Sequence, residues 1–459
     1  MKHKLYLVFT LFTIVCSAQQ PNWGWGLPIT VTGSSSITCT VTDPVNGTET
    51  HTQSGISSYI YSDGVVAYVT PGGTVGGIIY DVNTHRFEYT TFSSNSGNTI
   101  SNDDGVIAWV SSAGTVGGAT YDPTKRRWEY TTFSSNSGNT VINRHGVVAW
   151  VSSAGTVGGA VYDPYNGNWE YTTFSSNAGN TIINTHGVIG YVSTAGTVGG
   201  AVYDPATNDW EYTTFSSNSG NEIDNNNGVI AYLSAAGTVG GAAYDFNSHN
   251  WDYTTLSSNS NNTNLSVEDG TVTWSNNNGS QKAGYSSSGS WNTGNNTNLQ
   301  CRFFIEQPSN SNNLAYFWCL SIGANNYSYD SDAGHTISRR WGWKQYSNGG
   351  DYYPSLTISN SNSNSQCNNS VSFTTDIKEL LRDRISVYPS PTSNTLHLDG
   401  HGLSITTIEI VDATGKVVTG NNSFSYTTAI NVSSLNNGVY FLYATTNDGS
   451  KAVTRFVKQ

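Results

Sequence analysis

A cassette repeated every 41 residues constrains the fold more than any other feature of this sequence. It reads GTVGGAVYDPATNDWEYTTFSSNSGN at Gly196–Asn221, and close copies begin at Gly73, Gly114, Gly155 and Gly237. Aligned on an earlier glycine, the units start at Gly64, Gly105, Gly146, Gly187 and Gly228, with a degenerate sixth at Gly270. Self-similarity at this period is typical of repeat architectures and outweighs local propensity as a guide to the fold.

Each unit predicts four short strands and no helix. In the second unit the strand signals are NTIS, GVIAWVSS, TVGGATYDP and RRWEYTTFSS, separated by turns rich in Gly, Asn, Asp and Pro. Both alternating faces of VIAWV are apolar, so this strand must be covered on both sides. Four-stranded antiparallel sheets that stack face to face and repeat radially form a β-propeller. A β-trefoil closes with three repeats and fits this number of copies poorly.

The two ends of the repeat region predict how the ring closes. The segment ITCTVTDPVNGTETHTQSG from Ile37 resembles the third and fourth strands of a unit, and LPITVTG before it supplies a second strand. TNLQCRFFIEQ from Thr297 would provide the missing first strand, because a closed ring leaves no bare sheet edge. We therefore expect an all-β chain with a β-propeller over residues 22–302, with seven blades preferred and six as the alternative.

The first residues predict export. Lys2 and Lys4 precede the apolar run LYLVFTLFTIVC, and small residues follow, so residues 1–18 are expected to be a signal peptide cleaved near Ala18. No other apolar run approaches the length of a membrane span, so we expect no transmembrane segment in the mature chain. The net charge of −12, without a basic stripe, argues against nucleic acid or an anionic membrane as a partner.

The period is lost after residue 302 while strand signals continue. YSYDSDAG at Tyr327 and YSNGGDYYPSLTISNSNS at Tyr346 resemble the diagnostic stretches of PKD domains, although the usual aromatic, Gly-Asp-Gly turn is replaced by YDSDAG. PKD domains are small immunoglobulin-like sandwiches of bacterial surface proteins. The resemblance implies a β-sandwich over residues 303–373, and residues 374–384 are expected to be a linker.

The C-terminal segment carries the most specific motifs. ISVYPSPTSNTLHL, IEIVDATGKVV and INVSSLNNGVYFLYATTNDGSKAVTRFVKQ closely resemble the C-terminal sorting domain of type A cargo of the type IX secretion system, a family of Bacteroidota. The resemblance implies a β-sandwich over residues 385–459, contact with the secretion machinery, and a protein that is released or attached to the outer-membrane surface. The residues that match the motifs are Tyr388, Pro389, Pro391, Gly415, Gly438, Tyr440 and Lys458.

Four cysteines remain after the signal peptide, which contains Cys16, is removed. An even number in an exported chain predicts disulfides. Cys39 and Cys301 would lie together in the closing blade, and Cys319 and Cys367 would bridge the two sheets of the PKD-like sandwich. Their spacing is not that of a zinc site.

The sequence offers no catalytic signature. GxSxG, HExxH and P-loop motifs are absent, and the turn SNDDGVIAW at Ser101 departs from the Asp-box of sialidases because its aromatic residue comes one place late. The Glu of WEY recurs in every unit, and evenly spaced carboxylates cannot form the acid–base pair of glycoside hydrolysis. We expect no enzyme activity, cofactor or metal. An enzyme would instead need Glu268, Asp269 and Glu306 to converge on one cleft.

The repeated aromatic residues are the candidate ligand-binding residues. They either pack between blades or line grooves in which flat rings stack on sugars, with Asn and Ser as hydrogen-bonding partners. Identical sites would add through avidity, so we expect multivalent glycan or polysaccharide binding, and a protein-binding adhesive scaffold is the alternative. The candidates are Trp128, Trp169, Trp210 and Trp251, and Tyr121, Tyr162, Tyr203 and Tyr244.

Overall fold

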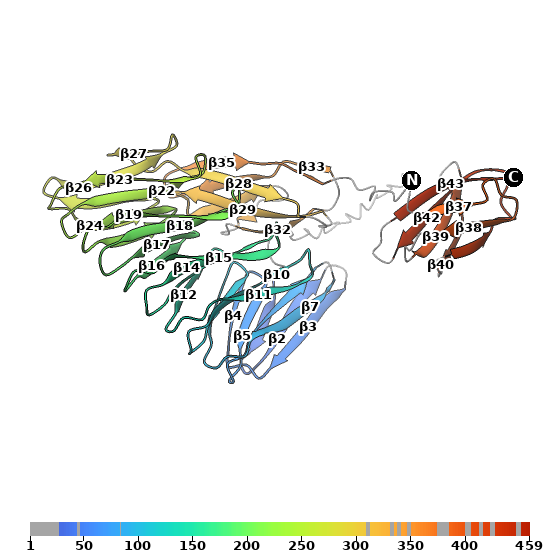
Figure 1. Cartoon of the computed structure of the whole chain (residues 1–459), viewed down its shortest axis with the longest axis horizontal. Helices are drawn as coiled ribbons and strands as arrows, with labels where there is room; N and C mark the ends of the chain where they lie inside the picture. Colours follow the sequence, from blue (N-terminus) through green and yellow to red (C-terminus); the bar gives the residue numbers. More distant parts are fainter. Residues whose placement is uncertain are drawn as a thin grey trace, which may run out of the picture. The chain divides into compact units, whose positions relative to one another are not determined.

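A computed structural model describes most of the chain (Figure 1). The described residues are 27–43, 46–82, 84–308, 313–330, 335–336, 341–346, 350–373, 385–399, 405–412, 416–422, 427–446 and 451–459. Within these ranges all regular secondary structure is β-strand, which confirms the all-β class, and no helix is long and apolar enough to span a membrane. The predicted signal peptide and the linker at 374–384 lie outside the described residues, as does the sorting-motif residue Gly415.

Each repeat folds as a four-stranded antiparallel sheet, as predicted. The strands pair in chain order, so that the first and fourth strands of each sheet are its edges. The bounds are β4 Ser58–Ser62, β5 Val65–Val69, β6 Val75–Asp81, β7 Arg86–Ser93; β8 Thr99–Asp103, β9 Val106–Val110, β10 Val116–Asp122, β11 Arg127–Ser134; β12 Thr140–Arg144, β13 Val147–Val151, β14 Val157–Asp163, β15 Asn168–Ser175; β16 Thr181–Thr185, β17 Val188–Val192, β18 Val198–Asp204, β19 Asp209–Ser216; β20 Glu222–Asn226, β21 Val229–Leu233, β22 Val239–Asp245, β23 Asn250–Ser257; and β24 Thr263–Glu268, β25 Thr271–Asn276, β26 Gly279–Ser286, β27 Ser290–Thr293.

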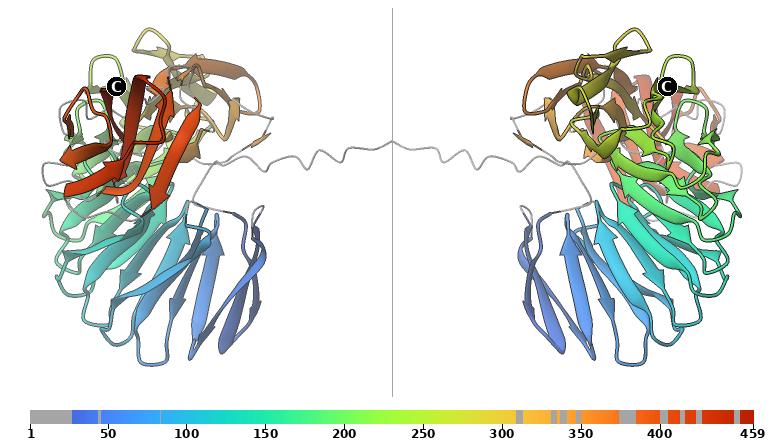
Figure 2. Two further views of the ribbon diagram at one scale, coloured as in Figure 1. Left: turned by 90° about the vertical axis from the view of Figure 1, so that its right-hand side faces the viewer. Right: turned by 90° about the vertical axis from the view of Figure 1, so that its left-hand side faces the viewer.

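Successive repeat sheets lie face to face along a curved path (Figures 1 and 2). Their second and third strands are buried on both faces, as the apolar pattern of VIAWV predicts. One hydrophobic core therefore runs through the stack, with side chains of each sheet packed against those of the next. The blade-like units of the predicted fold are present, and each is stabilised mainly by its neighbours.

A three-stranded sheet precedes the repeats and has two unlike faces. Its strands are β1 Thr30–Gly33, β2 Ser36–Asp43 and β3 Gly47–Ser54. Ile37, Cys39 and Val41 on one face pack against the first full repeat. Hydroxyl side chains cover the other face, where Thr38 of β2 pairs with Thr52 of β3. A polar outer face is typical of the terminal unit of a stack of repeats, because apolar side chains there would be exposed to water.

The predicted closing strand is wrong. The segment from Thr297 forms β28 (Gln300–Glu306), which pairs with β29 (Leu314–Ile322) and leaves the N-terminal sheet three-stranded. Pairing with the adjacent strand is favoured because consecutive strands need only a short connection. The count of six or seven blades stays a prediction, since it relied on this closure.

The segment from β28 to β36 forms two further sheets and a short strand pair. The boundary expected at residue 303 falls inside β28, and Phe304, Tyr316 and Trp318 belong to the same hydrophobic core as the repeats. Most of this segment lies in the same compact unit as the repeats, and a PKD-like β-sandwich over residues 303–373 stays a prediction. Its other strands are β30 Asn326–Asp330, β31 His335–Thr336, β32 Trp341–Gln345, β33 Gly350–Tyr352, β34 Ser355–Ser359, β35 Asn364–Asn368 and β36 Val371–Phe373.

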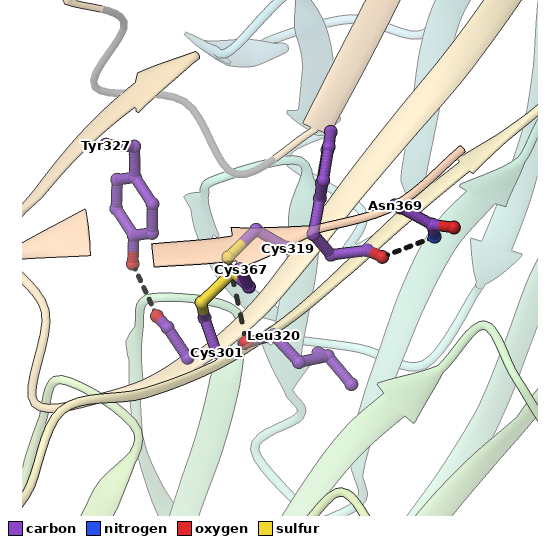
Figure 3. The surroundings of a disulfide bond; sticks show 8 residues. Cys301, Cys319, Leu320, Tyr327, Cys367 and Asn369 are labelled. Carbon is purple, nitrogen blue, oxygen red and sulfur yellow. Dashed lines mark hydrogen bonds between the residues drawn. A yellow bond between two sulfur atoms is a disulfide. The ribbon is translucent and has the colours of Figure 1, made fainter. Parts of the chain in front are cut away.

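The cysteine pairing also differs from the expectation (Figure 3). Cys301 of β28 is bonded to Cys367 of β35, across the two sheets, while Cys39 and Cys319 are buried and lie outside this disulfide. The predicted pairs Cys39–Cys301 and Cys319–Cys367 are wrong. The first depended on placing β28 in the N-terminal sheet, and the second on a PKD-like sandwich that did not include Cys301. Burial raises the pKa of the Cys39 thiol to about 11.

The last domain is a second compact unit with a core of its own. One sheet has the order β37-β38-β41 and the other the order β40-β39-β42-β43, as expected for a β-sandwich. The strands are β37 Ser386–Tyr388, β38 Thr395–Asp399, β39 Ile405–Asp412, β40 Val417–Asn422, β41 Thr427–Asn431, β42 Gly438–Thr446 and β43 Lys451–Lys458.

Candidate functional site

The four candidate tyrosines at the ends of the third strands are buried, not exposed. Each hydroxyl donates a hydrogen bond to a buried aspartate of the preceding repeat. The bonds are Tyr121 to Asp81 at 2.6 Å, Tyr162 to Asp122 at 2.6 Å, Tyr203 to Asp163 at 3.0 Å and Tyr244 to Asp204 at 2.8 Å. Burial, together with the neighbouring carboxylate, raises the pKa of each tyrosine. These residues join repeats and cannot stack on a sugar.

The four candidate tryptophans also lie between sheets. Trp128 and Trp210 are buried and Trp169 and Trp251 are half-buried. Each indole N–H donates to the backbone carbonyl of the acidic WEY residue in the preceding repeat, at 3.0 to 3.3 Å. The contacts of these eight aromatic residues are those of the packing alternative, and ligand binding by the half-buried Trp169 and Trp251 stays a prediction.

The paired glycines of TVGGA explain why the rings fit. A Cβ on Gly158 would lie 2.2 Å from Cζ2 of Trp150, and a Cβ on Gly159 would lie 2.8 Å from Cδ1 of Ile189 in the next repeat. Real Cβ atoms do not come that close to carbon atoms. The two glycines are thus required by the large side chains that pack over them, which is why they recur with the aromatic residues.

A different set of aromatic residues is exposed, one in each of the first five repeats. Each is the tyrosine of the WEY motif on the fourth strand (FEY in the first repeat, WDY in the fifth). We call these five residues the tyrosine row. Their exposed fractions are 56% for Tyr89, 49% for Tyr130, 46% for Tyr171, 48% for Tyr212 and 44% for Tyr253. Neighbouring fourth strands lie side by side in the stack, so the row continues from sheet to sheet. Face-to-face sheets are about 10 Å apart, which sets the spacing of the row.

The rings of the tyrosine row are held in place by the neighbouring sheet. The ring centroids of Tyr130 and Phe92 of the preceding repeat are 5.3 Å apart, and those of Tyr171 and Phe133 are 5.4 Å apart. The same contact, at 5.2 and 5.3 Å, holds the next two tyrosines. An exposed Thr follows each tyrosine two residues later, on the same side of the strand, as Thr132 follows Tyr130. Each repeat therefore presents a fixed aromatic ring with a hydroxyl beside it.

Sequence reasoning missed this row because Trp128 and Tyr130 have the same place in the strand alternation. Both face the preceding sheet, and both contact Phe92 of that sheet. They differ only in how much of the ring the preceding sheet covers. That difference depends on the offset between stacked sheets, which the strand pattern does not contain.

The carboxylates proposed for an enzyme do not gather in one place. Asp269 accepts hydrogen bonds from Asn325 and from Ser361, the latter at 2.5 Å. Glu306 accepts one from Tyr316 at 3.3 Å, and the groove that it lines includes neither Asp269 nor Glu268. Two copies of the repeated Glu form ion pairs with an arginine two residues earlier, Glu88 with Arg86 and Glu129 with Arg127, at 2.5 and 2.7 Å. In the part of the chain that the structure describes, no group of three His, Cys, Asp or Glu side chains could hold a metal ion.

The sorting-motif residues come together at one end of the second unit. The backbone N–H of Thr392, next to Pro391, donates to the carbonyl of Val457 at 2.9 Å, and Lys458 is mostly buried beside it. Tyr440 stacks on Phe456, with ring centroids 5.6 Å apart. Tyr388 is exposed. The first and last motifs, about 70 residues apart in sequence, are thus neighbours in space.

Comparison with known proteins adds to this geometry. Residues 386–459 match the model of the secretion system C-terminal sorting domain. No curated protein sequence matches the chain. Three solved structures illustrate the structural likenesses. PorZ of Porphyromonas gingivalis, an essential surface component of its type IX secretion system, has 11% identity and a TM-score of 0.22, over 94% of this chain and 70% of PorZ.

The other two are fungal proteins. Saccharomyces cerevisiae Sqt1 has 11% identity and a TM-score of 0.24, over 66% of this chain and 96% of its own. Kluyveromyces lactis Hsv2 has 9% identity and a TM-score of 0.27, over 60% of this chain and 96% of its own. The fold described above depends on the strand pairing of this chain and not on these likenesses. The match at residues 386–459 shows that the chain ends in a sorting domain of the type IX secretion system, and is exported to the cell surface or beyond.

Proposed function

We propose that this chain is a non-catalytic, multivalent polysaccharide-binding protein that works at or outside the cell surface. The tyrosine row is the observation that carries the proposal. Flat aromatic rings pack well on the C–H faces of sugars, and the hydroxyl of the neighbouring Thr is suited to bind a sugar hydroxyl. Rings repeated at equal intervals suit a polymer that is itself repetitive.

Repetition supplies the affinity that one such contact lacks. A single tyrosine on an open surface binds weakly, because little of the ligand is removed from water. Five tyrosines on one rigid stack bind the same polymer chain together, so the second and later contacts are intramolecular. The near identity of the repeats is then useful in itself, since a uniform row suits a uniform ligand.

A non-catalytic role is supported by the separation of the acidic residues. Glycoside hydrolysis needs two carboxyl groups at a separation of about 5 to 10 Å across the scissile bond. Of the acids considered for an enzyme, Glu306 lines a groove that includes neither Glu268 nor Asp269. The repeated acids are also engaged, since Glu129 pairs with Arg127 and Asp122 accepts a hydrogen bond from a tyrosine hydroxyl.

Affinity gel electrophoresis tests the proposal. The protein is run through gels that contain laminarin, xyloglucan, galactomannan, alginate or polygalacturonate, and the same polymers are assayed for released reducing ends. We expect at least one polymer to retard the protein without being cleaved. The triple variant Tyr130→Ala, Tyr171→Ala, Tyr212→Ala should migrate freely, and Tyr353→Ala, which removes an exposed tyrosine outside the row, should not change migration. Cleavage of a polymer, or retardation that the triple variant retains, would reject the proposal.

A further inference from the structure

A groove lies between β28 and the hairpin turns that join the third and fourth strands of the repeats. Its central part has a volume of about 430 Å³ and is lined by the turns after β14 and β18 on one side and by β28 on the other. A second hollow of about 500 Å³ adjoins it at Arg302 and is lined by the turn after β22. Sites for small ligands are commonly concave and of about this size. Unlike the tyrosine row, this groove has a wall, β28, that is not part of a repeat.

The wall formed by the repeats is where the repeats differ. The turn after the third strand reads PTKR, PYNG and PATN in three successive units, while the flanking strands are nearly identical. Tyr165 occupies a turn position that holds Thr124 and Ala206 in the neighbouring units, and its ring is 51% exposed. Its backbone N–H donates to the buried carboxylate of Asp163 at 2.8 Å, so the turn that carries the ring is fixed. Binding residues are commonly found on such variable turns of a uniform scaffold.

The wall formed by β28 presents Arg302, Phe304 and Glu306 along one side of the strand. The Arg302 guanidinium donates to the backbone carbonyl of Phe246 and lies 5.0 Å from the centre of the Phe304 ring. Glu306 accepts a hydrogen bond from the hydroxyl of Tyr316 at 3.3 Å. Burial raises the pKa of the Glu306 carboxyl. The charges of Arg302 and Glu306 offset each other, so the groove as a whole is close to neutral.

The disulfide holds this wall in place. Cys301, adjacent to Arg302, is bonded to Cys367 of β35, and Asn369 donates through its amide to the carbonyl of Phe303 at 2.6 Å (Figure 3). β28 is an edge strand of its sheet, and these two links fix its otherwise free side. The groove is thus formed before any ligand binds, which reduces the entropy lost on binding.

We propose that this groove binds one neutral pyranose unit of a glycan, with Tyr165 as the stacking ring and Glu306 and Arg302 as the polar contacts. A carboxylate accepts hydrogen bonds from sugar hydroxyls, a guanidinium donates to sugar oxygens, and an exposed ring covers a C–H face. A uronate would bring a negative charge to Glu306 and is disfavoured. The inference rests on the proposed function, because it assigns sugar selection to the groove and retention of the polymer to the tyrosine row.

Isothermal titration calorimetry of the full chain tests the groove. The probes are cellohexaose, laminarihexaose, mannohexaose and xylohexaose, with oligogalacturonate as the acidic sugar and an uncharged extended peptide as the non-sugar ligand. We expect a neutral oligosaccharide to bind with one site per chain. Glu306→Gln should weaken binding by about tenfold or more, because it removes a hydrogen bond to a charged group. Tyr165→Ala removes the stacking ring and should weaken binding by about tenfold as well. Glu306→Gln retains an acceptor for Tyr316, and thermal unfolding verifies that both variants are folded.

The control variant separates the two proposals. Tyr130→Ala, Tyr171→Ala, Tyr212→Ala should leave oligosaccharide binding unchanged while it abolishes retention by the polymer, and Tyr165→Ala should do the reverse. If no neutral oligosaccharide binds, or if the groove variants bind it as the unchanged protein does, the groove inference is overturned and the tyrosine row is unaffected. Binding of the acidic sugar or the peptide alone also overturns it. If the triple variant is still retained by the polymer while Glu306→Gln loses oligosaccharide binding, the proposal for the tyrosine row is rejected. The inference about the groove is then supported.

Discussion

The phenol of Tyr162 donates a 2.6 Å hydrogen bond to the buried carboxylate of Asp122 in the preceding repeat. The same bond recurs between the other full repeats and also joins Tyr80 to Asp43 of the N-terminal sheet, at 3.0 Å. A buried carboxylate is costly unless it is hydrogen-bonded. The repeat therefore contains an acceptor for the next unit and a donor for the previous one, which makes neighbouring units depend on each other.

Removing one such donor should destabilise the stack. We expect Tyr162→Phe to lower the free energy of unfolding by about 1 to 3 kcal/mol, because it leaves a buried acceptor without this partner. Urea unfolding followed by fluorescence measures the change. Tyr171→Phe removes a hydroxyl from an exposed ring of the same repeat and should have little effect. Equal stability of the two variants would mean that the bond between repeats adds nothing.

A methyl group added to the paired glycines should be costly. In Gly158→Ala the new Cβ would overlap the ring of Trp150, so we expect the free energy of unfolding to fall by about 1 to 3 kcal/mol. Gly190 gives a matched control, because the equivalent residue is Ala in the flanking units, Ala149 and Ala231, and a Cβ there has no neighbour closer than 3.5 Å. Gly190→Ala should raise stability by about 0.5 to 1 kcal/mol, since Ala is less flexible in the unfolded chain. Thermal unfolding of both variants checks this, and a destabilised Gly190→Ala would contradict the packing described.

The side chains of Cys39 and Cys319 should react with a thiol reagent only after unfolding. Cys39 and Cys319 are buried, and the pKa of Cys39 is raised to about 11, so little thiolate forms at neutral pH. We expect maleimide to modify neither in the folded protein, and both in denaturant without reductant. Cys301 and Cys367 should react only after reduction. Peptide mass spectrometry identifies the labelled residues, and labelling of Cys301 without reductant would show that the pairing is wrong.

The buried carboxyl of Asp104 predicts a dependence of stability on pH. Burial raises its pKa, as do the nearby Asp103 and Asp63, against a smaller opposing effect of His145. A raised pKa in the folded state gives stability that is present below the ordinary value, about 3.9, and is lost as pH rises through the raised value. Asp104→Asn cannot ionise, and Asn tolerates the positive φ of 49°.

At pH 7 this variant should therefore unfold at a higher temperature than the unchanged protein. Its free energy of unfolding should be higher by about 1 kcal/mol. The difference should shrink toward pH 4. Thermal unfolding at the two pH values measures it. A difference that grows on acidification would have the wrong sign for a buried carboxyl.

The sequence predicts what is repeated and local far better than what depends on distant contacts. The turns and apolar alternation of VIAWV and WEYTTF are enough to predict four strands in each unit and the burial of the middle two. β28 was misplaced because its pattern fits either the N-terminal sheet or β29, and the pairing is decided by the neighbour in the chain. The position of Tyr165 beside Glu306 depends on how β28 docks on the turns of the repeats, about 140 residues away in sequence.

A graded series of variants tests whether several tyrosines of the row bind one polysaccharide chain together. Dissociation constants for the retarding polysaccharide are obtained by affinity electrophoresis for the unchanged protein, for Tyr171→Ala, for Tyr130→Ala with Tyr171→Ala, and for the triple variant with Tyr212→Ala added. The account predicts that affinity falls at every step, while thermal unfolding stays close to that of the unchanged protein because these rings are largely exposed. An affinity that is the same for the single and the triple variant would contradict it.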